Sequence, residues 1–242
     1  FKNVLNVPIK LRYKKKYDLI EVKGKNEIQA FNYKIPGDIS SAAFFIVLTL
    51  LSKNSKLLLK NVNINPSRIG IIKILKRMGA KIKFLNKKNY KGEMIGDIFV
   101  KSTKNLKAIN LDSSQNSSVI DEFLLVFLVA SKCKGVSSFE KLSELNKKES
   151  KRLDWGIKIL KMMNVKVLKT KNNGIKIWGN NNSLPKKNYI IKNFLKDHRI
   201  FMLSAIAALS FGGNWKIYDP DSINTSFPGF IKTLNSLGAK IK

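Results

Sequence analysis

Three segments of the chain share one pattern of apolar and polar positions. In each segment apolar residues recur every three or four positions, and a Gly or Asn follows at the point where a helix would end. A short run with the alternation of a strand begins directly afterwards. The segments align without gaps at offsets of 85 and 74 residues: IKILKRMGAKI (72–82), IKILKMMNVKV (157–167) and IKTLNSLGAKI (231–241). The pattern therefore predicts a helix followed by a strand, three times over.

A second shared pattern lies upstream of each of these segments. It predicts a long helix that is apolar on nearly all sides, with an Asp at its start as a candidate N-cap. Such a helix is expected to be buried. A short β-rich run then follows. The three Asp residues are Asp38, Asp121 and Asp197, and the β-rich runs are KLLLKNV (56–62), GVSSFEKL (135–142) and NWKIYDP (214–220).

The repeated unit is thus helix, strand, helix, strand, and it predicts an α/β fold. A period near 80 residues is too long for a solenoid, so we expect one domain, 36–242, in which three repeats surround a pseudo-threefold axis. The repeats are about 36–110, 111–190 and 191–242. Residues 1–35 read as strands (17–24 and 27–35) outside the repeat, as expected for the end of a truncated first domain. The missing initiator Met fits a chain that starts within a longer protein.

The composition argues against a disordered chain and against a membrane-spanning protein. Hydrophobic residues make up 44% of the 242-residue chain, which is enough for a packed core. Apolar runs such as FLLVFLVA (123–130) are too short to cross a bilayer, and the N-terminus does not resemble a signal peptide.

Cys133 is the single cysteine, so no internal disulfide forms, and a small packing residue is favoured over a nucleophile. We expect a cytoplasmic protein without a membrane partner.

The formal net charge of +30 raises the alternative of a nucleic-acid-binding protein. Only five of the 46 basic residues are Arg, however, and nucleic-acid readers depend on the forked contacts of Arg. The lysines are spread along the whole chain together with many asparagines. A compositional bias is therefore favoured, with no nucleic-acid partner. Because Lys is the default cation here, each Arg becomes informative.

The starts of the predicted apolar helices are candidate anion sites. Free N–H groups and the helix dipole attract anions there, and threefold symmetry would bring equivalent ends to one face. His198 and Arg199 fall in the first turn after Asp197. A cation there is disfavoured by about 0.3–1 kcal/mol, which argues for a bound anion beside Arg199. An exposed Arg next to a capping Asp is the equally weighted alternative.

Two further clusters have both a structural and a functional interpretation. Glu149 and Arg152 lie three residues apart, so they share a helix face. They form either a surface pair or, with Lys148, an anion clamp in which Glu149 moves a proton. For Asp121 a plain N-cap is favoured over a catalytic base. For Arg68, in NPSRIG, a structural turn is favoured over a ligand contact.

Six motifs follow one another along the chain: PGDISSAAF (36–44), VNINPSRIG (62–70), IDE (120–122), ELNKKESKRL (144–153), DHRIFM (197–202) and NTSFPGF (224–230), followed by LGAKI (237–241). In this order they resemble the 5-enolpyruvylshikimate-3-phosphate synthase (3-phosphoshikimate 1-carboxyvinyltransferase) family, in its C-terminal half. The resemblance covers nearly the whole chain and implies the enolpyruvyl transferase fold, an inside-out α/β barrel-like domain of three βαβαββ repeats.

The resemblance implies a reaction of the shikimate pathway of aromatic amino-acid biosynthesis. The family transfers the enolpyruvyl group of phosphoenolpyruvate to the 5-hydroxyl of shikimate-3-phosphate and releases phosphate, with no metal or cofactor. It also implies the residue roles. Asp121 accepts a proton, Glu149 donates and accepts one at the methylene carbon, His198 lies close to the site, Lys148 lies near shikimate-3-phosphate, and Arg152 and Arg199 bind phosphoenolpyruvate.

The chain also departs from the family pattern. Asn146 replaces an Arg and Lys151 replaces an Asp, and the substrate-binding motifs of the family's N-terminal half are absent. We therefore expect this chain to be inactive alone, to need that N-terminal domain as its partner, and to be monomeric when complete. The sister UDP-N-acetylglucosamine enolpyruvyl transferase is an alternative, but its pattern reads DLR in place of DHR and lacks KES. A truncated paralogue kept for folding or interaction is another.

Overall fold

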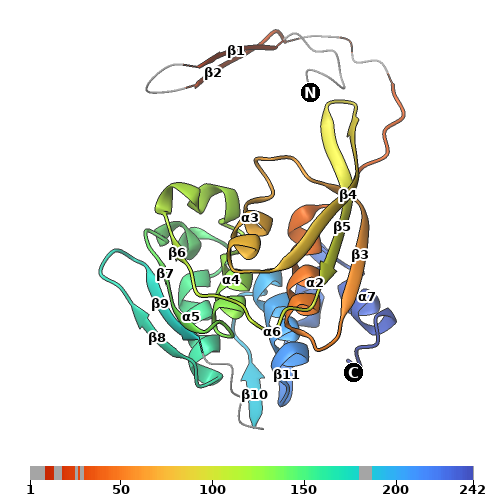
Figure 1. Ribbon diagram of the computed structural model, residues 1–242. Coiled ribbons are helices and arrows are strands. Elements are labelled where there is room, and N and C mark those ends of the chain that lie inside the picture. Colours follow the sequence, from red (N-terminus) through yellow and green to blue (C-terminus); the bar gives the residue numbers. More distant parts are fainter. Residues whose placement is uncertain (1–8, 14–17, 25–26, 28–29, 180–186, 242) are drawn as a thin grey trace.

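The computed structural model describes residues 9–13, 18–24, 27, 30–179 and 187–241. Three helices form its centre: α2 (Ile39–Leu51), α4 (Phe123–Ala130) and α6 (His198–Phe211). They pack against one another in pairs (Figure 1). Every residue of α4 is buried, as are most residues of α2 and α6. The prediction of three buried helices is confirmed, because helices that are apolar all round need partners on every side.

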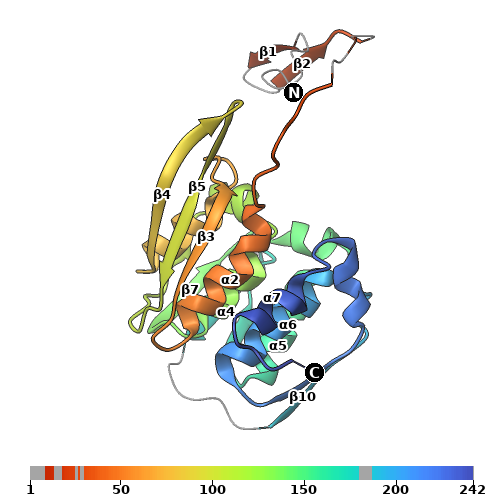
Figure 2. The same ribbon diagram turned by 90° about the vertical axis from the view of Figure 1, so that its right-hand side faces the viewer.

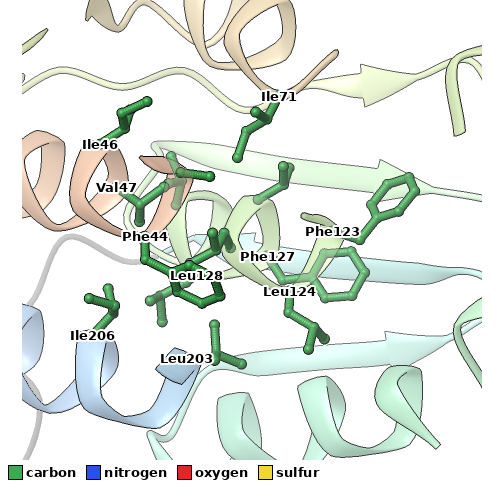
Figure 3. Close-up of a cluster of buried hydrophobic side chains, with 14 of the residues drawn as sticks. Phe44, Ile46, Val47, Ile71, Phe123, Leu124, Phe127, Leu128, Leu203 and Ile206 are labelled. Carbon is green, nitrogen blue, oxygen red and sulfur yellow. The ribbon is translucent and has the colours of Figure 1, made fainter. Parts of the chain in front are cut away.

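Figure 3 shows how these helices share one core. Side chains from all three meet between the sheets. Ile71 joins them from another helix, α3 (Gly70–Arg77). Among the residues drawn are Phe44, Ile46 and Val47 of α2, Phe123, Leu124, Phe127 and Leu128 of α4, and Leu203 and Ile206 of α6. The core holds the starts of the helices close together, which matters for the site described below.

Three separate sheets cover the central helices. The first has the order β3-β5-β4, the second β6-β7-β9-β8, and the third is the parallel pair β10-β11. All pairings in the first sheet are antiparallel, and β6 joins β7 in parallel. The strands are β3 (Lys56–Asn63), β4 (Lys81–Tyr90), β5 (Glu93–Lys101), β6 (Asn110–Leu111), β7 (Gly135–Phe139), β8 (Lys166–Lys169), β9 (Ile175–Gly179), β10 (Asn188–Ile191) and β11 (Asn214–Ile217).

The second helix of each repeat completes the unit. These helices are α3 (Gly70–Arg77), α5 (Arg152–Met162) and α7 (Phe230–Ser236). The middle repeat shows the whole order βαβαββ, from β6 to β9. In the first repeat an isolated bridge between Gly37 and Val62 stands in place of the opening strand. The α/β fold with three repeats is confirmed.

The third repeat differs from the prediction. The pattern predicts a strand directly after α7, but residues 239–241 form no strand. In the first two repeats the equivalent strands β4 and β8 pair with the last strand of the repeat, β5 or β9. Among the described residues the third repeat has no strand equivalent to β5 and β9, and β11 pairs with β10 alone. The backbone N–H of Ile241 bonds instead to Asn235 Oδ1 at 3.2 Å.

The N-terminal part also departs from the prediction. An antiparallel hairpin of β1 (Ile9–Tyr13) and β2 (Asp18–Val22) stands apart from the helices and sheets (Figure 2). Only β2 was predicted. The described residues 30–35 of the second predicted strand have no strand partner, and Tyr33 packs on Tyr90 with ring centroids 5.2 Å apart. No helix of the described part of the chain is long and apolar enough to span a membrane.

Three 3₁₀ helices precede α4, α5 and α7. They are η1 (Ser113–Val119), η2 (Ser143–Lys147) and η3 (Pro220–Thr225). Because η1 runs through a turn into α4, Asp121 lies in that turn and does not cap the helix. Glu122 takes the N-cap position but makes no capping hydrogen bond. The prediction of an N-cap at Asp121 is therefore wrong.

Candidate active site

The central helices begin at one end of the molecule, and two of the predicted caps are present there. Asp38 accepts hydrogen bonds from the backbone N–H groups of Ser40 and Ser41 at the start of α2. Asp197 accepts one from the backbone N–H of Arg199 at 2.9 Å, at the start of α6. The expectation that equivalent helix starts converge is confirmed, since the contacts described below join them.

Arg152 binds Asp197 at the centre of this end. The guanidinium donates from Nε to Oδ2 at 2.8 Å and from Nη2 to Oδ1 at 3.1 Å, and Ser150 Oγ donates to Oδ2 at 2.8 Å. Both charged side chains are almost fully buried, at 2% and 0% exposed. Burial alone would raise the pKa of Asp197, but Arg152, Ser150 and the Arg199 N–H outweigh it and lower that pKa.

Arg152 also contacts two other carboxylates. Its Nη2 donates to Glu149 Oε2 at 2.5 Å, and its Nη1 lies 3.4 Å from Asp121 Oδ1. Glu149 precedes α5, so the predicted shared helix face does not exist. The predicted contact forms nevertheless, because Arg152 is the first residue of α5 and the chain turns sharply just before it. The guanidinium is thus surrounded by three acids.

Lys148 adds a second cation on the open side of this cluster. Its Nζ lies 3.2 Å from Asp121 Oδ1, and both side chains are 31% exposed. Burial raises the pKa of Asp121, while the charges of Arg199, Lys148 and Arg152 lower it, and the net shift is downward. Asp121 is therefore an ionised carboxylate at neutral pH, held between cations and partly open to solvent.

Arg199 and His198 lie at the start of α6, as predicted. Arg199 Nη1 donates to the backbone carbonyl of Asp121 at 2.9 Å. Burial is the main cause that lowers the pKa of His198; Arg199 and Arg152 lower it further and Asp197 opposes them. The imidazole is therefore mostly neutral at pH 7. All six predicted site residues belong to this one cluster.

The sequence interpretation missed two residues of the cluster, Ser40 and Glu122. Ser40 Oγ donates a hydrogen bond to Glu122 Oε1. Burial raises the pKa of Glu122. An acid directly before a buried helix was the available signal for Glu122, whereas nothing marked Ser40. Arg68 lies 3.7 Å from Asp38 with both side chains more than half exposed, which fits the structural turn favoured for it.

A cavity of about 960 Å³ lies away from this cluster, at the opposite ends of the central helices. Its lining includes Leu51 at the end of α2, Ser52 directly after it, Lys132 after α4, and Leu209 of α6. The C-terminal ends of helices carry partial negative charge, so lysines there are favourable as structural partners. The helix dipoles therefore make this cavity a poorer place for an anion than the helix starts.

Comparison with known proteins shows the family of the chain. The family model of EPSP synthase (3-phosphoshikimate 1-carboxyvinyltransferase) matches residues 3–234. A 3-phosphoshikimate 1-carboxyvinyltransferase of Caldicellulosiruptor bescii is 37% identical over 216 residues, covering 89% of this chain and 49% of the relative. One of Ruthia magnifica is 39% identical over 221 residues, covering 90% and 49%. The chain thus spans about half the length of the relatives it matches.

Solved structures show the same relationship. The EPSP synthase of Acinetobacter baumannii superposes with a TM-score of 0.86 at 31% identity, covering 100% of this chain and 54% of that one. The enolpyruvyl transferase NikO of Streptomyces tendae superposes with a TM-score of 0.71 at 14% identity and supports the fold alone. The chain belongs to the EPSP synthase (3-phosphoshikimate 1-carboxyvinyltransferase) family.

Proposed function

We propose that this chain provides half of an enolpyruvyl transferase of the shikimate pathway. The reaction moves the enolpyruvyl group of phosphoenolpyruvate to the 5-hydroxyl of shikimate-3-phosphate and releases phosphate. Residues 36–242 act as the second domain, 1–35 as the end of the first, and an N-terminal half of the kind the relatives carry completes the site. A cytoplasmic location and a monomeric complete enzyme belong to the same proposal.

The observation that carries the proposal is the grouping of cations and acids at the helix starts. Lys148, Arg152 and Arg199 lie within one cluster with Asp121 and Glu149. Two anionic substrates need cations to hold them side by side. Addition to the enol double bond needs one proton delivered to carbon and one removed from a hydroxyl, which is work for carboxyl groups.

In this arrangement Arg152 needs to exchange a partner before it binds phosphoenolpyruvate. Its Nη2 is held by Glu149, whose side chain is 52% exposed, whereas its bond to buried Asp197 is fixed. An incoming anionic group takes the place of Glu149 on the guanidinium. The displaced Glu149 is then free to serve the methylene carbon. Asp121, between Lys148 and Arg152, takes the proton of the attacking hydroxyl.

Reconstitution tests the proposal. The 242-residue chain is combined with the N-terminal half of the Caldicellulosiruptor bescii relative, and phosphate release is followed with both substrates. We expect turnover from the pair and none from either half. A reconstituted pair carrying Glu149→Gln is the control for contaminating activity. Turnover by the 242-residue chain alone would contradict the proposed division of the site, and a folded but inactive pair would contradict the function.

The charge of +30 motivates one competing function, nucleic-acid binding. Fluorescence anisotropy with a labelled DNA duplex at physiological salt, with and without phosphoenolpyruvate, distinguishes the two. Tight, salt-dependent binding that ignores phosphoenolpyruvate would favour the competing function. Offering UDP-N-acetylglucosamine as acceptor to the reconstituted pair tests the sister reaction, and we expect no turnover with it.

A further inference from the structure

Glu122 is a buried carboxyl to which the proposed reaction gives no role. Its side chain is 6% exposed, and it directly follows Asp121 at the start of α4. The hydroxyl of Ser40, in the first turn of α2, donates a hydrogen bond to Oε1. Nη1 of Arg199, from the first turn of α6, lies 3.8 Å from the same oxygen. One residue from each of the three repeats therefore meets at this carboxyl.

Glu122 and a neighbouring carbonyl act on the same nitrogen of Arg199. Nη1 donates to the backbone carbonyl of Asp121 at 2.9 Å and faces the Glu122 carboxyl. Nε and Nη2 of Arg199 make no hydrogen bond to any described residue of the chain. The guanidinium is a rigid planar fork with five N–H groups. Fixing Nη1 therefore sets the direction of the N–H groups that remain available.

Keeping an acid at this position is costly. A buried carboxyl loses its hydration, and burial raises the pKa of Glu122, against the opposing effects of Ser40 and Arg199. Asp121 adds like-charge repulsion, and Arg68 is the other cation that acts on this group. An apolar side chain of similar size fills buried space without that cost. The contact with Arg199 is what the acid supplies and an apolar residue does not.

We propose that Glu122, anchored by Ser40, is a positioning residue that orients the Arg199 guanidinium toward an anionic group of the substrate. The inference rests on the proposed function, since it describes how the same site binds its anion. Glu122 itself touches no reacting atom. It acts through Arg199, and Ser40 makes the orientation depend on the first repeat.

The 242-residue chain labelled with ¹⁵N-arginine provides a direct test. It contains five arginines, so its Nε–H spectrum is simple, and Arg199→Lys identifies the Arg199 signal. We expect Glu122→Ala to move this signal toward that of a free arginine. The affinity of Glu122→Ala for phosphoenolpyruvate, and for inorganic phosphate as a second probe, should fall about tenfold or more. This is the size expected when a misdirected Arg199 loses one hydrogen bond to the charged ligand.

Three companion variants separate positioning from packing. Glu122→Gln keeps the side-chain size and an oxygen for Ser40 and Arg199, so it should restore most of the parent signal. Ser40→Ala should shift the Arg199 signal in the same direction as Glu122→Ala, but less. Ser41→Ala is the matched control, because that hydroxyl bonds to Asp38 and not to Glu122. It should leave the Arg199 signal in place.

A double-mutant cycle completes the test. In an Arg199→Lys background, Glu122→Ala should cause no further loss of phosphoenolpyruvate affinity. Additive losses would overturn the proposal, as would an unmoved Arg199 signal in Glu122→Ala with only the melting temperature lowered. The Arg199 signal does not depend on turnover. Failure of the reconstituted pair to react would therefore count against the proposed function and leave the Glu122 result to be judged separately.

Discussion

Arg152 holds Asp197 through two hydrogen bonds, from Nε at 2.8 Å and from Nη2 at 3.1 Å, and the pair ties the start of α5 to the start of α6. The first residue of the second helix of the middle repeat thereby bonds to the N-cap of the first helix of the third repeat. Neither side chain has meaningful contact with solvent. The arrangement has consequences for stability, for pH dependence and for the roles of the neighbouring acids.

Removing one member of this pair should be expensive. We expect Arg152→Ala to lower the free energy of unfolding by about 3–5 kcal/mol, because it leaves Asp197 buried without its charge partner. Urea unfolding followed by circular dichroism measures the change. Lys169→Ala is the control, since Lys169 and Asp154 form a pair that is nearly half exposed and such pairs contribute little. Equal losses in the two variants would contradict the buried pair.

The stability of the chain should fall in acid partly through Asp197. Its pKa in the folded chain is lowered, so the unfolded chain binds the proton more tightly. The stabilisation is therefore present above the unfolded value, about 3.9, and is lost as pH falls through the folded pKa. Urea midpoints from pH 6 down to pH 2 should show this loss. Asp197→Asn should be less stable at pH 6 and should lose less on acidification than the parent.

Glu149 and Arg152 should separate kinetically in the reconstituted enzyme. We expect Glu149→Gln to lower kcat by about 10²–10⁴, the usual contribution of a positioned proton donor. KM for phosphoenolpyruvate should stay the same or fall, since Arg152 loses a competing carboxylate. Arg152→Lys should instead raise that KM about tenfold or more, because Lys lacks the fork. Assays run well below both melting temperatures exclude unfolding, and the reverse pattern would mean that the roles are exchanged.

Cys133 should be unreactive until the chain unfolds. The thiol is buried and lies 3.4 Å from the carbonyl oxygen of Val129, and burial raises its pKa to about 12. The thiolate needed for alkylation is therefore scarce in the folded chain. Intact-mass spectrometry after brief exposure to iodoacetamide at pH 8 should show no adduct, and one adduct in 6 M guanidinium chloride. Rapid labelling of the folded chain would place Cys133 outside the core.

Most of the repeated architecture could be predicted from the sequence because it follows from local patterns. The apolar helices 39–51, 123–130 and 198–211 are buried as expected, and the segments 72–82 and 157–167 each give a helix and a strand. The local pattern wrongly predicts a strand after α7. Its pattern matches the others, but a strand also needs a neighbour, and pairing is a property of the whole sheet.

Some features of the site could likewise be predicted from the sequence, and others could not. Arg152 and Arg199 stood out because Arg is scarce in this chain, and the helix starts indicated where an anion would lie. No local pattern indicates that Arg152 is buried against Asp197, since 45 residues separate them. The Ser40–Glu122 contact spans 82 residues and needed the folded structure for the same reason. The capping role expected of Asp121 failed because a 3₁₀ helix displaces the start of α4.

The three aspartates at equivalent places in the repeats have become different from one another. Asp38 caps its helix, Asp197 caps its helix and also holds Arg152, and Asp121 caps nothing and faces Lys148. Three identical groups around a threefold axis would present the same chemistry in every direction and could not tell one end of a ligand from the other. The divergence of these copies gives the site a polarity, so that an unsymmetrical molecule can be held in a single orientation.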